Sequence, residues 1–202
     1  MLAARVVILA AIVVACRPAQ PTQLRDGDII FQTSKSAQSL AIQRATHSPY
    51  SHMGLILYRG AKPYVFEAVG PVRYTPLQAW INRGLGGHYV VKRLGAANAL
   101  GDAVSIDKLR RAAETFQGRP YDLTFEWSDS RIYCSELVWK AYERALGVRI
   151  GALQRLRDFD LSDPEVQARM KQRYGSTIPL DELVISPAAM FAAPVLVTVL
   201  TR

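Results

Sequence analysis

Short segments rich in aliphatic and aromatic residues recur along this chain, and this pattern limits the fold more than any other feature. They occupy residues 29–31, 52–58, 64–69, 88–94 and 195–200. Their length and composition are typical of β-strands, and the middle three are bounded by Gly or Pro. Because helical patterns alternate with them, the sequence predicts an α+β fold, a mainly antiparallel sheet with helices packed against it.

Apolar residues at helical spacing predict the helices. We expect helices over residues 36–45, 76–82, 105–117, 134–146 and 164–173. In the first, Leu40 and Ile42 are expected to face inward. The helix 134–146 has the strongest stripe (Leu137, Val138, Ala141 and Ala145) and ends at Gly147. Helix 164–173 is predicted to be a basic surface helix, and strand 195–200 a buried closing strand.

Residues 1–16 have the features of an export signal. Arg5 precedes an apolar run of about ten residues, which spans roughly 15 Å as a helix, only half of a bilayer core. The run ends in Val-Val-Ala-Cys, which resembles a bacterial lipobox with Cys16 as the lipidated residue. We therefore expect a periplasmic protein that is anchored by lipid to the outer membrane. The alternative is a plain signal peptide in which Cys16 is incidental.

One domain follows the signal. Residues 17–24 form a polar, Pro-containing spacer, and no break in composition divides residues 25–202. The formal net charge of +8 is dispersed along the chain, so nucleic acid is not an expected partner. No cluster of His, Cys and carboxylates has the spacing of metal ligands, so neither a metal nor a cofactor is expected.

Cys134 stands at the first turn of the strongest predicted helix. The partial positive charge of a helix N-terminus stabilises a thiolate. The free N–H groups there are also suited to an oxyanion. If Cys16 carries a lipid, Cys134 has no partner for a disulfide, since the chain has two cysteines. The position of Cys134 by itself is equally consistent with a small hydrophobic residue buried in the core.

Three histidines are available as a base for this thiol. His47 closes the first helix and is most simply a cap or loop residue. His88 opens a strand, where an exposed or half-buried position explains it. His52 begins the strand 52–58, and alternation places it on the same face as Gly54, which leaves space beside it.

Glu67 lies in an apolar strand and therefore needs a partner. If residues 59–62 form a four-residue hairpin loop, Tyr58 lies opposite Pro63. Glu67 is then a diagonal neighbour of His52, roughly 7–8 Å away at the backbone, and its carboxylate can orient the imidazole. The alternative pairs Glu67 with Arg73 or Lys92 at a sheet edge.

Three blocks carry a resemblance to a known family: residues 50–55 (YSHMGL), 66–72 (FEAVGPV) and 133–138 (YCSELV). From about Leu24 the chain resembles the permuted papain-like amidases, the YiiX/YebB-like group of the NlpC-type cysteine hydrolases. Residues 26–31, 121–122 and 185–187 extend the resemblance. It implies a permuted papain-like fold, in which the histidine strand precedes the cysteine helix, and a triad of Cys134, His52 and Glu67.

The resemblance also implies hydrolysis of an amide, peptide or related acyl bond through a thioester on Cys134. Tyr50 or Tyr133 is expected to add a hydroxyl donor for the substrate. The expected substrate is an amide- or acyl-containing molecule of the cell envelope, either a peptidoglycan peptide or a lipid. The alternatives are a lipid acyl hydrolase or acyltransferase of the same fold, and a non-catalytic envelope binding module in which Cys134 is a core thiol.

Overall fold

A six-stranded antiparallel sheet forms the centre of the molecule, with strand order β4-β3-β2-β1-β5-β8. The computed structural model describes residues 23–95 and 102–202, so the predicted signal and Cys16 lie outside the described residues. The strands are β1 (Ile29–Gln32), β2 (His52–Arg59), β3 (Lys62–Glu67), β4 (Arg73–Pro76), β5 (Val90–Leu94) and β8 (Leu196–Thr201). The predicted α+β class is confirmed.

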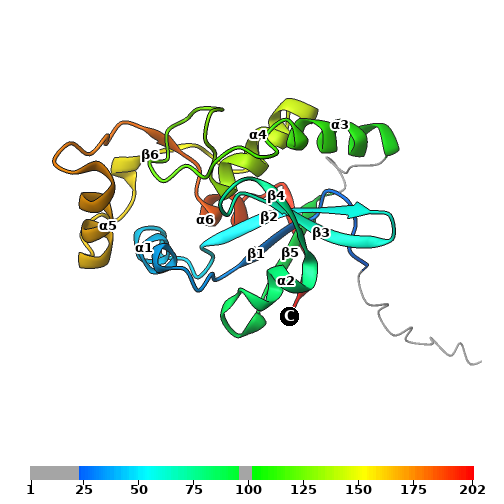
Figure 1. Cartoon of the computed structure of the whole chain (residues 1–202), viewed down its shortest axis with the longest axis horizontal. Coiled ribbons are helices and arrows are strands. Elements are labelled where there is room, and N and C mark those ends of the chain that lie inside the picture. The colour runs from blue at the N-terminus through cyan, green and yellow to red at the C-terminus, as the bar shows by residue number, and fades with distance from the viewer. Residues whose placement is uncertain (1–22, 96–101) are drawn as a thin grey trace, which may run out of the picture.

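Helices cover both faces and one end of this sheet (Figure 1). Helices α3 (Ala103–Glu114) and α4 (Cys134–Leu146) lie over one face, and α2 (Leu77–Asn82) lies over the other. Helices α1 (Ala37–Thr46) and α5 (Pro164–Tyr174) pack together at one end. The remaining elements are α6 (Pro187–Phe191), the 3-10 helices η1 (Leu85–Gly87) and η3 (Leu156–Asp158), and a small sheet of β6 (Gln154–Arg155) and β7 (Leu183–Val184).

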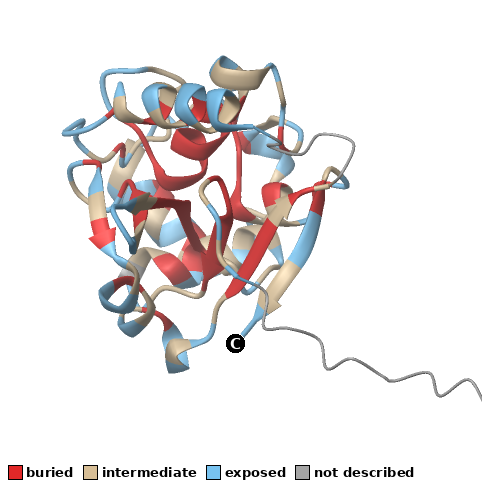
Figure 2. Cartoon of the chain, turned by 90° about the vertical axis from the view of Figure 1, so that its right-hand side faces the viewer, coloured by how far each residue is buried: buried red, intermediate tan, exposed pale blue. Residues whose placement is uncertain are grey.

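The core is divided by the sheet into two clusters, because successive side chains of a strand point to opposite faces. Met53, Leu55 and Leu57 of β2 pack in the cluster of α4, whereas Ile56 packs against Trp80 of α2. Figure 2 shows the buried residues gathered along the strands and the helices against them. This is the predicted alternation, and it places His52 on the face of Ile56. None of the helices in the described ranges is long and apolar enough to cross a membrane.

Several helix details differ from the prediction. In α1 the buried residues include Ser39 and Ala41, and Leu40 is 46% exposed, so the expectation of an inward Leu40 is wrong. Helix α3 begins two residues early because the Asp102 carboxylate accepts a hydrogen bond from the Ser105 N–H at 2.7 Å and so caps it. It also ends at Glu114, well before Gly118.

The solvent exposure predicted for two elements is wrong. Strand β8 is an edge strand and largely exposed, with Val197 at 49%, so it is not a buried closing strand. Helix α5 is not only a surface helix, since Val166 and Met170 are buried. These two residues are one turn apart on an otherwise polar helix, and α1 is the neighbour that α5 contacts.

The hairpin between β2 and β3 fixes the register that the site needs. Tyr58 lies opposite Pro63, as predicted, and Arg59 pairs with Lys62. Continuing this register brings Gly54 opposite Glu67, and a Cβ atom on Gly54 would overlap the Val65 side chain and lie 3.3 Å from the Glu67 Cβ. The absence of a side chain at Gly54 therefore makes room for the neighbouring strand.

We expect Gly54→Ala to lower the free energy of unfolding by about 1–3 kcal/mol, because the added methyl group overpacks the core between β2 and β3. Gly70→Ala is the matched control, since a Cβ there meets nothing within 4 Å, and it should change stability by less than about 0.5 kcal/mol. Urea denaturation of both variants measures the difference. Equal stability of Gly54→Ala and the wild type would contradict this packing argument.

Candidate active site

Cys134 is the first residue of α4, as the sequence predicted. The helix begins there because Tyr133 is extended and its N–H lies 3.4 Å from the Glu136 Oε2 atom, while the Leu137 N–H closes the first turn on the Tyr133 carbonyl at 3.0 Å. The thiol is free and the residue is only 3% exposed. The first backbone N–H groups of a helix have no partner within it, so the sulfur lies at a site suited to negative charge.

His52 and Glu67 are joined by a hydrogen bond. Their Nε2 and Oε2 atoms are 2.6 Å apart, as the predicted register requires. The imidazole also interacts with the Cys134 sulfur. Since Nε2 is occupied by Glu67, Nδ1 is the nitrogen that remains for the thiol.

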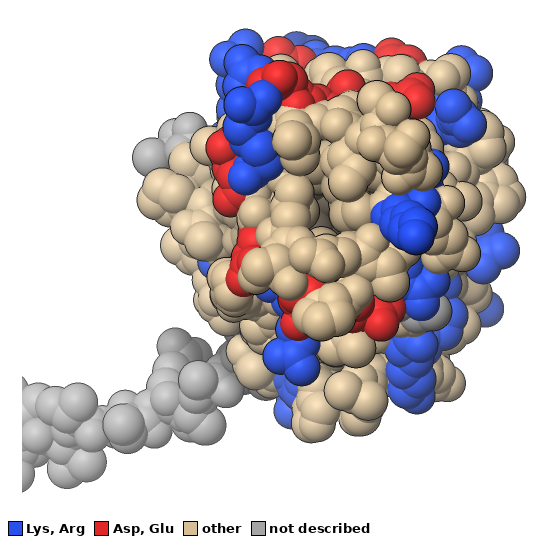
Figure 3. Space-filling model, turned by 90° about the vertical axis from the view of Figure 1, so that its left-hand side faces the viewer, with Lys and Arg blue, Asp and Glu red and all other residues tan. Residues whose placement is uncertain are grey.

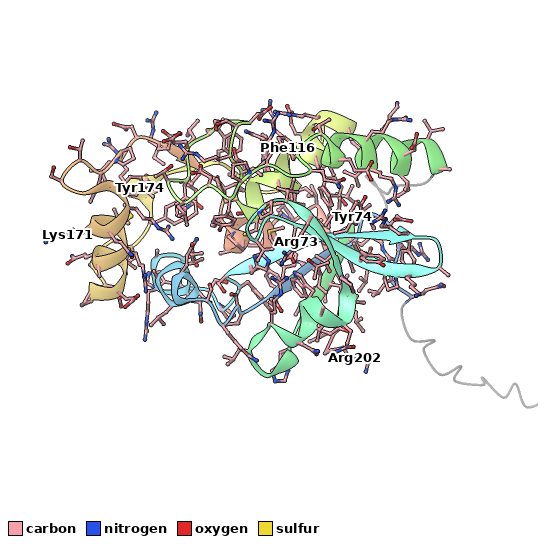
Figure 4. The ribbon with its side chains drawn as sticks, viewed as in Figure 1. Arg73, Tyr74, Phe116, Lys171, Tyr174 and Arg202 are labelled. Carbon is pink, nitrogen blue, oxygen red and sulfur yellow. The ribbon has the colours of Figure 1, made fainter. Side chains whose placement is uncertain are left out.

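The alternative partners of Glu67 are excluded by the structure. Arg73 is exposed on β4, where Figure 4 labels it, and the Lys92 ammonium donates to the Phe191 carbonyl. Of the other histidines, His47 caps α1 with a positive φ and pairs with Asp160 at 3.2 Å, and His88 is exposed. Cys134, His52 and Glu67 are thus the residues that the fold brings together.

Two further residues hold the Glu67 carboxylate, and sequence analysis missed both. The Thr75 hydroxyl donates to Oε1 at 2.6 Å, and the Arg83 guanidinium pairs with the same oxygen. Thr75 directly precedes the predicted helix 76–82, and Arg83 directly follows it, sixteen residues after Glu67. No local pattern identifies either one, because strand pairing of β3 with β4 and the packing of α2 create the contact.

These contacts determine the charges of the pair. Burial would raise the pKa of Glu67, but the hydrogen bonds from His52 and Thr75 and the charges of His52 and Arg83 outweigh it and lower that pKa. Burial would lower the pKa of His52, but hydrogen bonding and negative charge from Cys134 and Glu67 raise it to about 9. Glu67 is therefore ionised and His52 protonated at neutral pH.

The raised pKa of His52 makes the stability of the fold depend on pH. Because the folded-state pKa of His52 is about 9, above the unfolded value of about 6.5, its protonated form stabilises the fold. This contribution is complete below pH 6.5 and is lost as the pH rises through about 9. Trp80 lies against the ring, with centroids 5.9 Å apart, and shields it from water.

Tyr121 is a further residue that site prediction missed. Its hydroxyl accepts a hydrogen bond from the Gln38 amide at 3.2 Å. Burial first, and then the negative charge of Cys134, raise its pKa well above the ordinary value, so it remains a neutral donor. The block 121–122 of the family resemblance was the one sequence signal that pointed to it.

The two tyrosines predicted to bind substrate lie differently. The Tyr133 hydroxyl accepts a hydrogen bond from the Ile185 N–H at 3.1 Å, although the residue lines a cavity beside Cys134. Tyr50 stacks on Phe191, with ring centroids 4.0 Å apart. It lines neither the cavity beside Cys134 nor a second cleft beside His52. The structure therefore gives both side chains packing contacts.

An apolar cavity opens on the Cys134 side. It holds about 90 Å³ of open volume, less than the roughly 300–1,000 Å³ of a usual small-molecule site, so it is suited to a slender group. Its walls come from α1, α5, η3 and the loops beside them, and include Phe125, Leu156, Phe159, Leu161, Val166 and Met170. In Figure 3, the face that carries α1 and α5 is hollowed, and uncharged atoms surround the hollow.

A second cleft, which is polar, opens on the His52 side. Its lining includes Ser34, Lys35, Ser51, Asn82 and Arg83 in addition to His52. Both cavities share Gln38, Ile42 and Tyr121, so they adjoin at these residues, with Cys134 in the lining of the first and His52 in that of the second. The candidate site thus has one apolar and one polar side.

A cysteine at the start of a helix, packed on an antiparallel sheet that carries a histidine, defines a papain-like cysteine hydrolase fold, here in the permuted order with the histidine strand first. The family described as "Permuted papain-like amidase enzyme, YaeF/YiiX, C92 family" matches residues 23–200. The chain belongs to this family. The resemblance and fold predicted from the sequence are therefore confirmed.

Two relatives from Escherichia coli support the assignment. The uncharacterized protein YiiX of strain K12 is 55% identical over 182 residues, which cover 90% of this chain and 89% of that protein. A solved structure, described as the crystal structure of metalloprotein yiiX from E. coli O157:H7, DUF1105, is 56% identical with a TM-score of 0.85. That match covers 88% of this chain and 97% of the solved one.

The E. coli structure is described as that of a metalloprotein, and this description applies to that protein. In the described ranges of this chain, no group of three or more His, Cys, Asp or Glu side chains is placed to hold a metal ion. At the candidate site, Glu67 is already bound by His52, Thr75 and Arg83, which leaves the sulfur and one ring nitrogen as donors. These two donors do not fit a protein metal site.

We expect Glu67→Gln to lower the pKa of His52 from about 9, because the variant removes the negative charge that stabilises the imidazolium. The pH titration of the His52 ring resonances by NMR measures the change. Glu114→Gln, which removes a carboxylate bound to Tyr74 instead, should leave the titration unaltered. An unchanged His52 titration in Glu67→Gln would show that the two groups are not electrostatically coupled.

Proposed function

We propose that this protein hydrolyses an amide or related acyl bond through a thioester on Cys134, with His52 as acid and base and Glu67 as the group that orients His52. The observation that carries the proposal is the hydrogen-bonded Glu67–His52 pair next to a free thiol at a helix N-terminus. A protonated imidazole beside a sulfur favours the nucleophilic thiolate.

The reaction proceeds in two steps. The Cys134 thiolate attacks the carbonyl carbon, the C–S bond forms, and the C–N bond breaks as His52 gives its proton to the leaving nitrogen. Neutral His52 then takes a proton from water, whose oxygen attacks the thioester. The C–S bond breaks, the carboxylic acid leaves, and the imidazolium–thiolate pair is restored.

Oxyanion stabilisation comes from the start of α4. The unpaired backbone N–H groups of its first turn, including that of Cys134, are donors at the place where negative charge develops. The Tyr121 hydroxyl is a second donor, since its oxygen already accepts from Gln38 and its own hydrogen is free for another acceptor.

The apolar cavity favours a fatty acyl group as the portion that becomes attached to Cys134. Phe125, Val166 and Met170 line it, and a hydrocarbon chain is buried against such residues at less cost than the polar atoms of a peptide. We therefore place an N-acyl amide of a fatty acid first among substrates. A peptidoglycan peptide is the second candidate, and the polar cleft beside His52 is the feature that favours it.

We also propose that the protein acts at the cell envelope as a lipid-anchored periplasmic hydrolase. The argument is the sequence of residues 1–16, an Arg followed by an apolar run that ends in Cys16. Its membrane anchor would hold the active site close to acyl-containing substrates. Mass spectrometry of the protein purified from membranes tests the lipid on Cys16, and an unmodified or absent Cys16 peptide argues for the plain signal.

We expect Cys134→Ser to reduce hydrolysis of N-dodecanoyl amides by at least about a thousandfold, because a serine hydroxyl is a far weaker nucleophile than a thiolate. Its unfolding free energy should stay within about 1 kcal/mol of the wild type. Product release followed by mass spectrometry and urea denaturation measure the two quantities. Retained turnover would exclude Cys134 as the nucleophile, and slow labelling of wild-type Cys134 by iodoacetamide at pH 6 would favour the binding module.

We expect Val166→Phe to fill the apolar cavity and to lower kcat/KM about tenfold or more for a dodecanoyl amide, with a smaller effect on the acetyl amide of the same amine. Gln167→Phe is the matched control, because Gln167 is the neighbouring exposed residue on α5. Kinetics with both amides measure the split. Equal losses for the long and the short acyl group would contradict an acyl site in this cavity.

A further inference from the structure

The two sides of the candidate site correspond to the two parts of a substrate. The acyl carbon must lie at the Cys134 sulfur, which faces the apolar cavity, and the leaving nitrogen must lie at His52, which gives it a proton. The leaving group therefore extends into the polar cleft beside His52. This step depends on the proposed function, since it uses the roles assigned to Cys134 and His52.

The charges in that cleft have one sign. Its lining contains the cations Lys35 and Arg83 and no Asp or Glu. Arg83 is largely neutralised by its ion pair with Glu67, which lies buried beneath the cleft. Lys35 is exposed, and no carboxylate lies within salt-bridge distance of it among the described residues. The sequence outside those residues contains no Asp or Glu either.

Lys35 is held in place by its surroundings. It belongs to the loop between β1 and α1, where the Ser34 N–H donates to the Ser51 hydroxyl at 2.9 Å. Ser34 also forms a β-bridge with Gly84, the residue after Arg83. The Lys35 ammonium lies 3.4 Å from the Asn82 carbonyl oxygen. The bridge between Ser34 and Gly84 thus brings the backbones of Lys35 and Arg83 to the same cleft, whose lining contains both residues.

We propose that the polar cleft binds an anionic leaving group, a carboxylate or phosphate monoester carried on the amine, and that Lys35 is its principal charged partner. The substrate class is then an N-acyl amine with an anionic group, with its hydrocarbon chain on the Cys134 side. Hydrolysis releases a fatty acid and an amine that bears the anion. An amino acid or a phosphoethanolamine-type headgroup supplies this chemistry, and the two are distinguished by experiment.

The experiment compares four dodecanoyl amides that share one acyl group: N-dodecanoyl-glycine, its neutral glycinamide analogue, N-dodecanoyl-phosphoethanolamine and its neutral ethanolamine analogue. We expect kcat/KM of the full-length wild type to be about three- to tenfold higher for the anionic amide that it prefers than for the neutral analogue of that amide. The glycine pair reports on carboxylates and the ethanolamine pair on phosphates. The preference should decrease with ionic strength, because screening weakens the attraction.

Lys35→Gln should remove this preference by lowering kcat/KM about three- to tenfold more for the anionic amides than for their neutral analogues, and Lys35→Arg should retain most of the preference. Lys62→Gln, at the exposed hairpin between β2 and β3, is the matched control and should alter neither value. Equal kcat/KM for anionic and neutral amides in the wild type, or an equal loss of both in Lys35→Gln, would overturn the anion site without affecting the proposed hydrolase.

Binding separates this inference from a failure of the chemistry. Titration of the four amides into the Cys134→Ala variant measures affinity without turnover, and the anionic member should bind about three- to tenfold more tightly. Loss of that difference on adding Lys35→Gln supports the site. If no amide is hydrolysed by the wild type but the anionic amides bind with this preference, the proposed function fails while the anion site stands.

Discussion

The buried carboxylate of Glu67 is the constraint on which the rest of the candidate site depends. A charge with no exposure to solvent is stable only where several donors compensate for its lost hydration. Its donors come from three places: His52 on β2, Thr75 on β4 and Arg83 after α2. The register of the sheet and the packing of α2 are thereby coupled to the orientation of the imidazole that faces Cys134.

This coupling explains why so much of the fold surrounds one ion pair. Gly54 leaves the space that Val65 and Glu67 occupy, and Trp80 shields the histidine from the other side. Hydrogen bonding and negative charge from Cys134 and Glu67 together raise the pKa of His52 to about 9, and this surrounding structure keeps the carboxylate ionised beside it. Helix α4 then supplies the sulfur at its N-terminus, on the opposite face of the sheet from α2.

The chemical division of the site follows from the same architecture. The α1–α5 contact builds an apolar wall beside the sulfur, and the β1–α1 loop places a lysine beside the histidine. A substrate that spans both cavities would present hydrocarbon to one and charge to the other. The proposed hydrolysis and the proposed anion site each use one half of this arrangement.

Much of the candidate site was predictable because two of its features depend on residues that are close together in the sequence. A tight hairpin fixed the register of Glu67 against His52, and a stripe of apolar residues with a terminal Gly located Cys134 at a helix start. The sequence did not predict that Arg83 and Thr75 bind Glu67, or that two residues of α5 are buried. These contacts join segments that are distant in the chain. In α5 the polar pattern predicted a surface helix, whereas Val166 and Met170 are buried in the core cluster and α5 packs against α1.

The sequence by itself determined the α+β class, the family and the three residues proposed for catalysis, since strand alternation, helix periodicity and matched motifs are properties of short segments. Tertiary structure alone decided which groups keep Glu67 charged, where the apolar cavity lies and where Lys35 stands. Those features depend on side chains brought together across the sheet. Their energies arise from burial and from charges a few ångströms apart, which are properties of the folded chain and not of any one segment.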